Sequence, residues 1–63
     1  MREIQWNDFP YAGMKVRFIT KEDKNKIHIG KYDFNSTCNR RFFDENNKEY
    51  SSNDILLWEE IND

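Results

Sequence analysis

The chain has little of the chemistry that usually holds very small proteins together. Its 63 residues include one cysteine, Cys38, and one histidine, His28. An intrachain disulfide and a zinc site built from four Cys or His ligands are therefore both excluded. Only two glycines are present, and no glycine-rich loop that could cradle a phosphate is formed. We expect no cofactor, no metal ligands and no enzymatic activity.

Long hydrophobic runs are also missing. The longest apolar stretch is Ile55-Leu56-Leu57-Trp58, far short of the ~20 residues that a membrane span needs. Polar residues follow Met1 closely, so no signal peptide is visible. Together with the lone thiol, this pattern predicts a cytoplasmic protein without membrane contact.

Aromatic residues are plentiful, with ten Phe, Tyr and Trp in the chain. A domain of this size buries only about 60% of its unfolded surface, so large rings are its main source of burial. We expect Trp6 and Trp58, near opposite ends, to form two sides of one core. Residues 1–63 are then a single small β domain.

Two segments alternate between apolar and polar residues, the pattern of half-buried strands. The first is 14–20, with Val16 and Phe18 facing inward, and polar residues 21–25 suit a hairpin loop. The second is 26–34, whose alternation breaks at Gly30. Because an isolated glycine in a strand often marks a bulge, we predict one at Gly30.

The rest of the chain predicts shorter elements. Residues 39–44 suit a third strand with Phe42 or Phe43 inward, and residues 48–50 suit a returning strand after a polar turn. Residues 51–54 could cap a helix over 55–61, or 55–61 could form a strand. We favour the strand, because a β-rich chain needs a partner for its edge.

These elements predict a mainly β fold: a small, strongly bent antiparallel sheet or an SH3-like, partly open barrel of four to five strands. The like-charged strand edges disfavour self-pairing, so we expect a monomer. The expected core comprises Trp6, Phe9, Val16, Phe18, Ile27, Ile29, Tyr32, Phe34, Phe42, Leu57 and Trp58.

The net charge of −2 is unevenly distributed along the chain. Residues 14–41 hold eight basic against three acidic residues, whereas residues 42–63 hold one basic against seven acidic residues. A basic sheet face could bind a nucleic-acid backbone, and its candidate contacts are Lys15, Arg17, Lys26 and Arg41. We favour the alternative that the two segments pair across strands and neutralise each other, because the chain is acidic overall.

The leading functional hypothesis is a non-enzymatic module that binds another protein. Small barrels offer an edge strand and an aromatic groove to peptides, and the candidate contacts are Tyr11, Tyr32, Phe43 and Tyr50. By alternation His28 lies on the polar face, without a neighbouring acid and nucleophile to make it a catalytic base. Cys38 is expected to be a small buried residue at a strand start rather than a reactive thiol.

The opening Trp6 and the following Phe9-Pro10-Tyr11-Ala12-Gly13-Met14-Lys15-Val16 resemble a group of small uncharacterised phage and bacterial domains. Those domains begin with Trp, pass through a Leu-Pro-x-x-Gly-x-x-Val turn and end in a Trp-containing strand. The segment 27–33 is similar to their second strand. The end departs from them, because 58–61 lacks the prolines of their Trp-Met-Pro-Leu-Pro closure. The resemblance implies an SH3-like or related barrel from a phage, mobile element or gut-type bacterium, and it carries over no catalytic residue.

Overall fold

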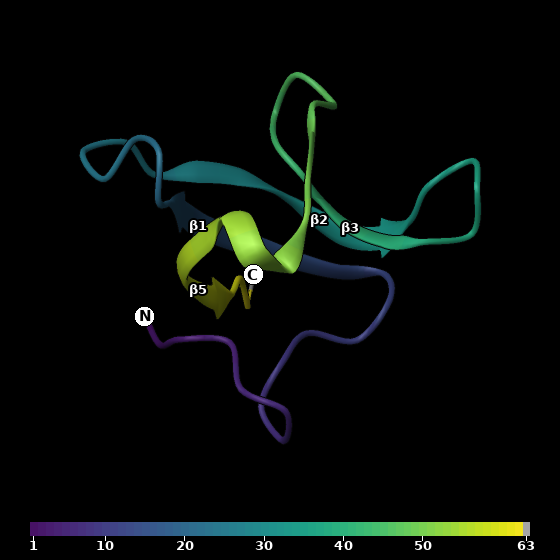
Figure 1. Cartoon of the computed structure of the whole chain (residues 1–63), viewed down its shortest axis with the longest axis horizontal. Coiled ribbons are helices and arrows are strands. Elements are labelled where there is room, and N and C mark those ends of the chain that lie inside the picture. Colours follow the sequence, from purple (N-terminus) through teal and green to yellow (C-terminus); the bar gives the residue numbers. More distant parts are fainter. Residues whose placement is uncertain (63) are drawn as a thin grey trace.

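The computed structural model describes residues 1–62 and arranges them around one antiparallel five-stranded sheet (Figure 1). The strands are β1 (Met14–Thr20), β2 (His28–Phe34), β3 (Arg40–Phe43), β4 (Glu49–Tyr50) and β5 (Ile55–Glu60), and a 3-10 turn, η1 (Ser52–Asp54), precedes β5. Their order in the sheet is β4-β3-β2-β1-β5. The predicted mainly β fold is confirmed.

The sheet curls so strongly that its two halves face each other. Strands β4 and β1 are three positions apart in the sheet order, which in a flat sheet would separate them by about 14 Å. The ring centroids of Tyr50 on β4 and Phe18 on β1 nevertheless lie 5.7 Å apart. At the end of β1, the Lys21 amide donates to the Asp54 carbonyl of η1 at 2.9 Å. The result is the expected partly open barrel.

One face of the curled sheet encloses the core. On β1, every second residue from Met14 to Thr20 is buried, as the alternation predicts. The buried hydrophobic residues are Met14, Val16, Phe18, Tyr32, Phe42, Ile55 and Trp58. Five of the predicted core residues are thus confirmed, and Leu57 is half-buried. Phe42, rather than Phe43, is the inward residue of β3.

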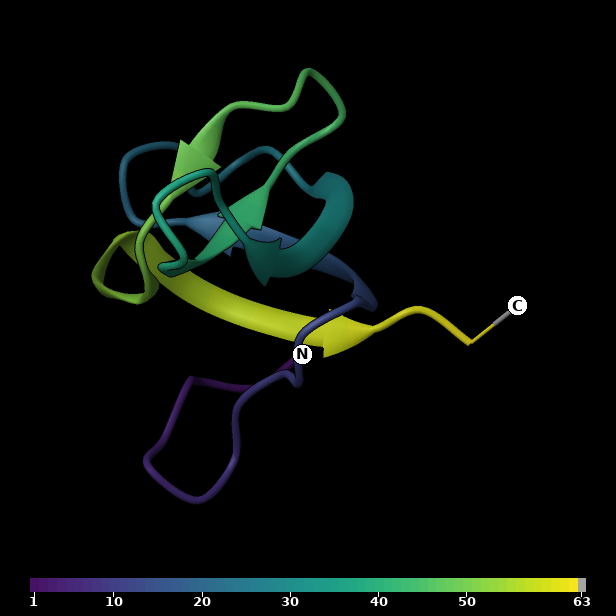
Figure 2. The ribbon, with the colours of Figure 1, turned by 90° about the vertical axis from the view of Figure 1, so that its right-hand side faces the viewer.

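The placement of Trp6 in the core is wrong. Its side chain is 89% exposed, and Phe9 is also exposed. The chain pairs with β5 through Arg2 and then leaves the sheet. It reverses direction at Trp6-Asn7, where Gln5 and Asp8 exchange two backbone hydrogen bonds of 3.0 Å. This segment projects away from the sheet as a separate loop (Figure 2).

The bulge predicted at Gly30 is also wrong. The register between β1 and β2 runs without a break from Met14↔Tyr32 to Phe18↔His28. Gly30 serves a close backbone approach instead, because a Cβ there would overlap the backbone oxygen of Phe43 on the neighbouring strand β3. The register shift of the sheet lies between β1 and β5, at Ile19 and Thr20.

Because β2 has no bulge, the residues before Gly30 face opposite to the prediction, whereas Tyr32 points inward as predicted. His28 points inward and is only 6% exposed, which corrects its predicted place on the polar face. Ile27 and Ile29 are exposed rather than buried. Phe34 is exposed too, because it ends the strand beyond the core, where the Arg40 guanidinium lies 5.5 Å from its ring.

The C-terminal segment forms the favoured strand, β5, rather than a helix. The polar residues before it form η1, where Ser51 and Asp54 make a reciprocal capping box. On its outer side, β5 pairs with Arg2 through two backbone hydrogen bonds at Trp58. The N-terminal segment therefore pairs with β5 through Arg2 rather than through Trp6. Asp63, one of the acidic residues assigned to this edge, lies outside the described residues.

The two tryptophans give a matched pair for testing the core. Trp58 is almost fully buried and Trp6 almost fully exposed. Trp58→Ala should lower the free energy of unfolding by about 3–5 kcal/mol, which is most of the stability of a minimal domain. Trp6→Ala should change it by less than about 0.5 kcal/mol. Urea unfolding followed by circular dichroism measures both, and equal midpoints for the two variants would contradict this core.

Candidate functional site

The N-terminal loop displays three aromatic side chains to solvent. We call residues 3–13 the aromatic loop, because Trp6, Phe9 and Tyr11 are all exposed on it. Trp6 is at its tip, in the two-residue turn between Gln5 and Asp8. Tyr11 is 63% exposed, and its hydroxyl donates to a Glu60 carboxylate oxygen at 3.4 Å. The loop therefore presents aromatic surface from a defined backbone.

Both ends of the aromatic loop are fixed to the sheet. At its start, the Arg2 guanidinium covers the Trp58 ring at 4.2 Å, and its Nε lies 2.7 Å from an Asp8 carboxylate oxygen. At its end, Pro10 is fully buried. Gly13 then adopts a φ of 94°, a conformation that favours glycine, and its amide donates to the Tyr32 carbonyl at 2.7 Å. These attachments limit the conformational entropy that the loop would lose on binding.

The four predicted protein contacts lie in different places. Tyr11 belongs to the aromatic loop, but Tyr32 is only 4% exposed and is part of the core. Phe43 is half-buried on the outer face of the sheet, with the Lys31 ammonium 5.5 Å from its ring. Tyr50 is half-buried against the core. The structure thus gathers Tyr11 with Trp6 and Phe9, which sequence patterns assigned to the core.

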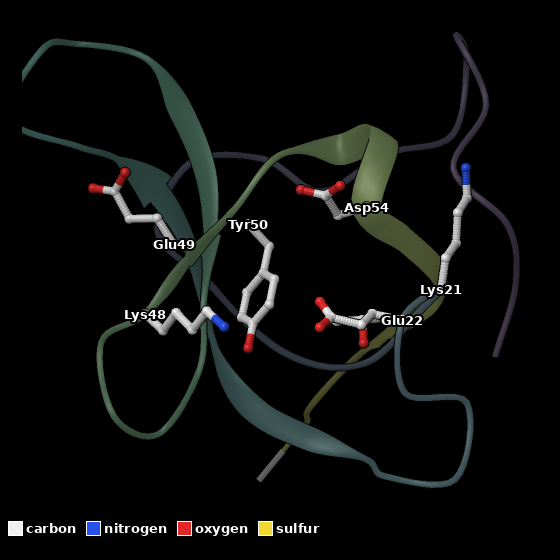
Figure 3. A pocket seen from close by; sticks show the side chains of 7 residues that line it. Lys21, Glu22, Lys48, Glu49, Tyr50 and Asp54 are labelled. Carbon is white, nitrogen blue, oxygen red and sulfur yellow. The ribbon is translucent and has the colours of Figure 1, made fainter.

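Tyr50 also lines a surface cavity of about 430 Å³ at the open side of the barrel. Its ring stands in the middle of the cavity, between Lys48 and Glu49 of the β4 segment and Glu22 and Asp54 opposite (Figure 3). The lining includes three acidic residues, Glu22, Glu49 and Asp54, and two lysines, Lys21 and Lys48. This cavity is consequently lined mainly by charged residues around a single ring.

The four predicted nucleic-acid contacts do not form one free basic patch. Arg17 lies 2.9 Å from a Glu59 carboxylate oxygen, and the Lys26 ammonium lies 3.6 Å from Glu45. Arg41 faces Asp33 in the register of β3 against β2. The pairs of Arg17 with Glu59 and of Lys26 with Glu45 agree with the expectation that the basic and acidic segments pair across strands, whereas Asp33 belongs to the basic segment itself.

Lys15 is the exception among these four residues. It lies opposite Lys31 in the register of β1 against β2, and both side chains are exposed. The two lysines border a hollow of about 510 Å³ that is also lined by Ile29 and Ile61. A pair of like charges on neighbouring strands is unfavourable, although the acidic residue Asp44 also lines this hollow.

A polar cluster surrounds the buried His28. Its ring stacks on Phe18 at 5.3 Å and lies 5.6 Å from the ring of Tyr50. Its Nδ1 faces carboxylate oxygens of Asp44 at 4.0 Å and Glu45 at 3.6 Å. Sequence reasoning missed this cluster, because His28 was assigned to the other face and the two acids follow it by sixteen and seventeen residues.

Hydrogen bonds set the ionisation of the residues around His28. Burial alone would raise the pKa of Asp44, but hydrogen bonds from the Lys48 and Asn46 amides and the Tyr50 hydroxyl outweigh it and lower that pKa below its ordinary value. A hydrogen bond from the Ile29 amide lowers the pKa of Glu45. Burial, and then the hydrogen bond to Asp44, raises the pKa of Tyr50. Both carboxylates are therefore ionised at neutral pH.

Cys38 is exposed in the turn between β2 and β3, where its φ is 63°. Its predicted role as a small buried residue at a strand start is wrong. The turn is organised by Asn35 instead, whose side-chain oxygen accepts hydrogen bonds from the amides of Thr37 and Asn39.

Comparisons of the chain with protein-family models, curated proteins and solved structures find no match. Within residues 1–62, no helix has both the length and the apolar character needed to cross a bilayer. The resemblance to phage and bacterial domains therefore remains a prediction from the sequence.

Asp44 should make the protein sensitive to acid. Because its folded-state pKa lies below the ordinary 3.8, its stabilising contribution is complete above that pH and is lost as the pH falls through the lower folded value. Asp44→Asn should cost about 1–3 kcal/mol at neutral pH and give a shallower loss of stability in acid. Unfolding measured across the acid range tests this. The control Asp23→Asn removes the same charge from an exposed loop, and an acid profile changed equally by both variants would contradict the assignment.

Proposed function

We propose that this protein is a non-enzymatic protein-binding module that docks through its aromatic loop. The observation that carries the proposal is the exposure of Trp6 at the tip of a loop fixed at both ends. Tryptophan and tyrosine are enriched among the residues that dominate protein interfaces. We expect the partner to have an apolar pocket that receives the Trp6 indole, with Phe9 and Tyr11 at the rim of that pocket.

The biological setting of this proposal comes from the sequence. The likeness of the first two strands to phage and bacterial domains supports an accessory role in a phage or mobile element. The lone thiol supports a cytoplasmic location. The Arg2 pairing on the outer edge of β5 and the shortness of β4, only two residues long, support a monomer. A sedimentation mass near 7.8 kDa would agree with the monomer, and twice that mass would contradict it.

Replacing Trp6 tests the docking surface directly. Trp6→Ala should abolish capture of the partner from the native host, because truncating such an interface residue costs about 2 kcal/mol or more, or roughly 30-fold in affinity. With a purified partner, the Trp6 fluorescence of the wild-type protein should shift to shorter wavelength on binding.

The matched control is Phe34→Ala, which truncates an exposed ring at the end of β2. This variant should retain the partner, and both variants should melt like the wild-type protein. A partner held equally by Trp6→Ala, or flotation of the protein with lipid vesicles through Trp6, would refute the proposal.

A second candidate function, nucleic-acid binding, is favoured by the facing pair Lys15 and Lys31. If this pair contacts phosphates, affinity should fall with salt, with a logarithmic slope of about 0.9 for each phosphate neutralised on duplex DNA. Lys15→Glu should weaken binding to all sequences alike, whereas Lys24→Glu, on the exposed β1–β2 loop, should not. A titration at low salt without any complex on duplex or single-stranded nucleic acid would eliminate this candidate.

A further inference from the structure

Three potential metal ligands meet beneath the β3–β4 turn. One ligand atom each from His28, Asp44 and Glu45 lies within 4.8 Å of the other two. His28 comes from the start of β2, and the two acids follow the end of β3. The three side chains thus bring an imidazole nitrogen and two carboxylate oxygens together from different parts of the chain.

The imidazole nitrogen that faces this cluster has no hydrogen-bond partner among the described residues. His28 Nδ1 is fully buried and unpaired, although a buried polar atom in this state costs about 1–3 kcal/mol. Its distances of 3.6 Å to Glu45 and 4.0 Å to Asp44 are too long for hydrogen bonds. They are close to the ligand–ligand spacing of about 3.3 Å that follows from tetrahedral bonds of 2.0–2.1 Å to zinc. A small contraction of these distances would bring the ligand atoms within bonding distance of a central ion.

Each of the three side chains is positioned by contacts that leave one of its potential ligand atoms facing the cluster. The His28 ring is stacked on Phe18. Asp44 Oδ1 accepts hydrogen bonds from the amides of Asn46 and Lys48 at 2.8 and 3.0 Å, which leaves Oδ2 facing His28. Oδ2 also accepts a hydrogen bond from the Tyr50 hydroxyl. Glu45 Oε2 accepts the Ile29 amide at 3.0 Å, which leaves Oε1 toward His28. Such outer contacts orient the ligands of established metal sites.

The charges also suit a divalent cation. The two ionised carboxylates carry a net charge of −2, which one divalent ion would neutralise, and an imidazole that ligates a metal adds no charge of its own. Among the described residues, the only ammonium at the cluster is that of Lys26, which lies 3.6 Å from Glu45 Oε1. The Lys26 side chain is half exposed. It can swing into solvent when an ion takes its place. One imidazole among oxygen ligands favours zinc-class ions over Mg²⁺ and Ca²⁺, which prefer oxygen alone.

We propose that His28 Nδ1, Asp44 Oδ2 and Glu45 Oε1 bind a divalent transition-metal ion, Zn²⁺ or a close equivalent, whose remaining positions are open to water. The site goes beyond the proposed docking function and is independent of it, because it uses no residue of the aromatic loop. Bound metal would tie the start of β2 to the β3–β4 turn. Because a ligand that binds only the folded state stabilises that state by mass action, bound metal should raise the stability of the folded protein.

The test uses the tag-free full chain with Cys38→Ser, which removes the exposed thiol as a competing ligand. Zn²⁺ is titrated calorimetrically, and thermal unfolding is followed with and without it. Zn²⁺ should bind with one-to-one stoichiometry and raise the melting temperature, whereas Mg²⁺ at equal concentration should not. In nitrogen-correlated NMR spectra, Nδ1 of His28 should shift on binding more than Nε2.

Two variants remove ligands in different ways. His28→Phe keeps a ring against Phe18 and Tyr50. Glu45→Gln changes an exposed residue and keeps a side-chain oxygen that can accept the hydrogen bond from the Ile29 amide. Each should weaken Zn²⁺ binding by about tenfold or more, while the control Glu22→Gln, an exposed acid near His28, should bind like the parent protein. Zn²⁺ binding unchanged in both ligand variants, or no binding by the parent, would overturn the proposal. Because Glu45 is on the surface, its variant answers the question even if His28→Phe fails to fold.

Discussion

The two-sided pairing of Trp58 is the constraint on which the rest of this structure depends. On one side its backbone exchanges both hydrogen bonds with Arg2, at 2.9 and 3.0 Å. On the other side it stands opposite Phe18 of β1, and a residue whose amide and carbonyl are already used forms the closer, non-hydrogen-bonded type of antiparallel pair. The Trp58 backbone is therefore held between β1 and the N-terminal segment.

This two-sided pairing links the core to the candidate docking surface. The Arg2 side chain covers the Trp58 ring and also binds Asp8, so one residue connects an almost fully buried aromatic to the turn that carries the most exposed one. A change at Trp58 would thus reach Trp6 without any contact between the two rings. For this reason, partner binding by any core variant is interpretable only alongside its stability.

Sequence patterns predicted the strands well and the facing of residues less well. Regular alternation placed Val16 and Phe18 correctly, and the need for an edge partner correctly favoured a strand at 55–61. The error on β2 arose because hydrophobicity favours Ile27 and Ile29 as core residues over His28. Their facing is decided by the β1–β2 register and by the contact of Gly30 with the Phe43 backbone, and such long-range information is not contained in a local pattern.

The candidate sites were less predictable than the fold for the same reason. The side chains around His28 converge only after β2 and β3 have paired, and their spacing matches no familiar metal motif. Tyr11 was correctly singled out as an exposed aromatic, whereas Trp6 and Phe9 were assigned to the core on the assumption that a minimal domain buries its largest rings. That assumption is sound in general, and its failure here is informative.

The failure identifies what the aromatic loop costs the protein. Burying one ring of 150–250 Å² is worth roughly 4–6 kcal/mol at 25 cal/mol per Å², comparable to the whole stability of a small domain. Among residues 1–62 the core has seven buried hydrophobic residues, yet Trp6, Phe9 and Tyr11 remain outside it. Their segment is secured by an ion pair, a buried proline and backbone hydrogen bonds. A chain with so little apolar material gains nothing in folding from a rigid, exposed tryptophan. Burial of this ring by a second molecule would supply the missing gain, and for this reason we propose the binding surface on this loop rather than in the charge-lined cavity beside Tyr50.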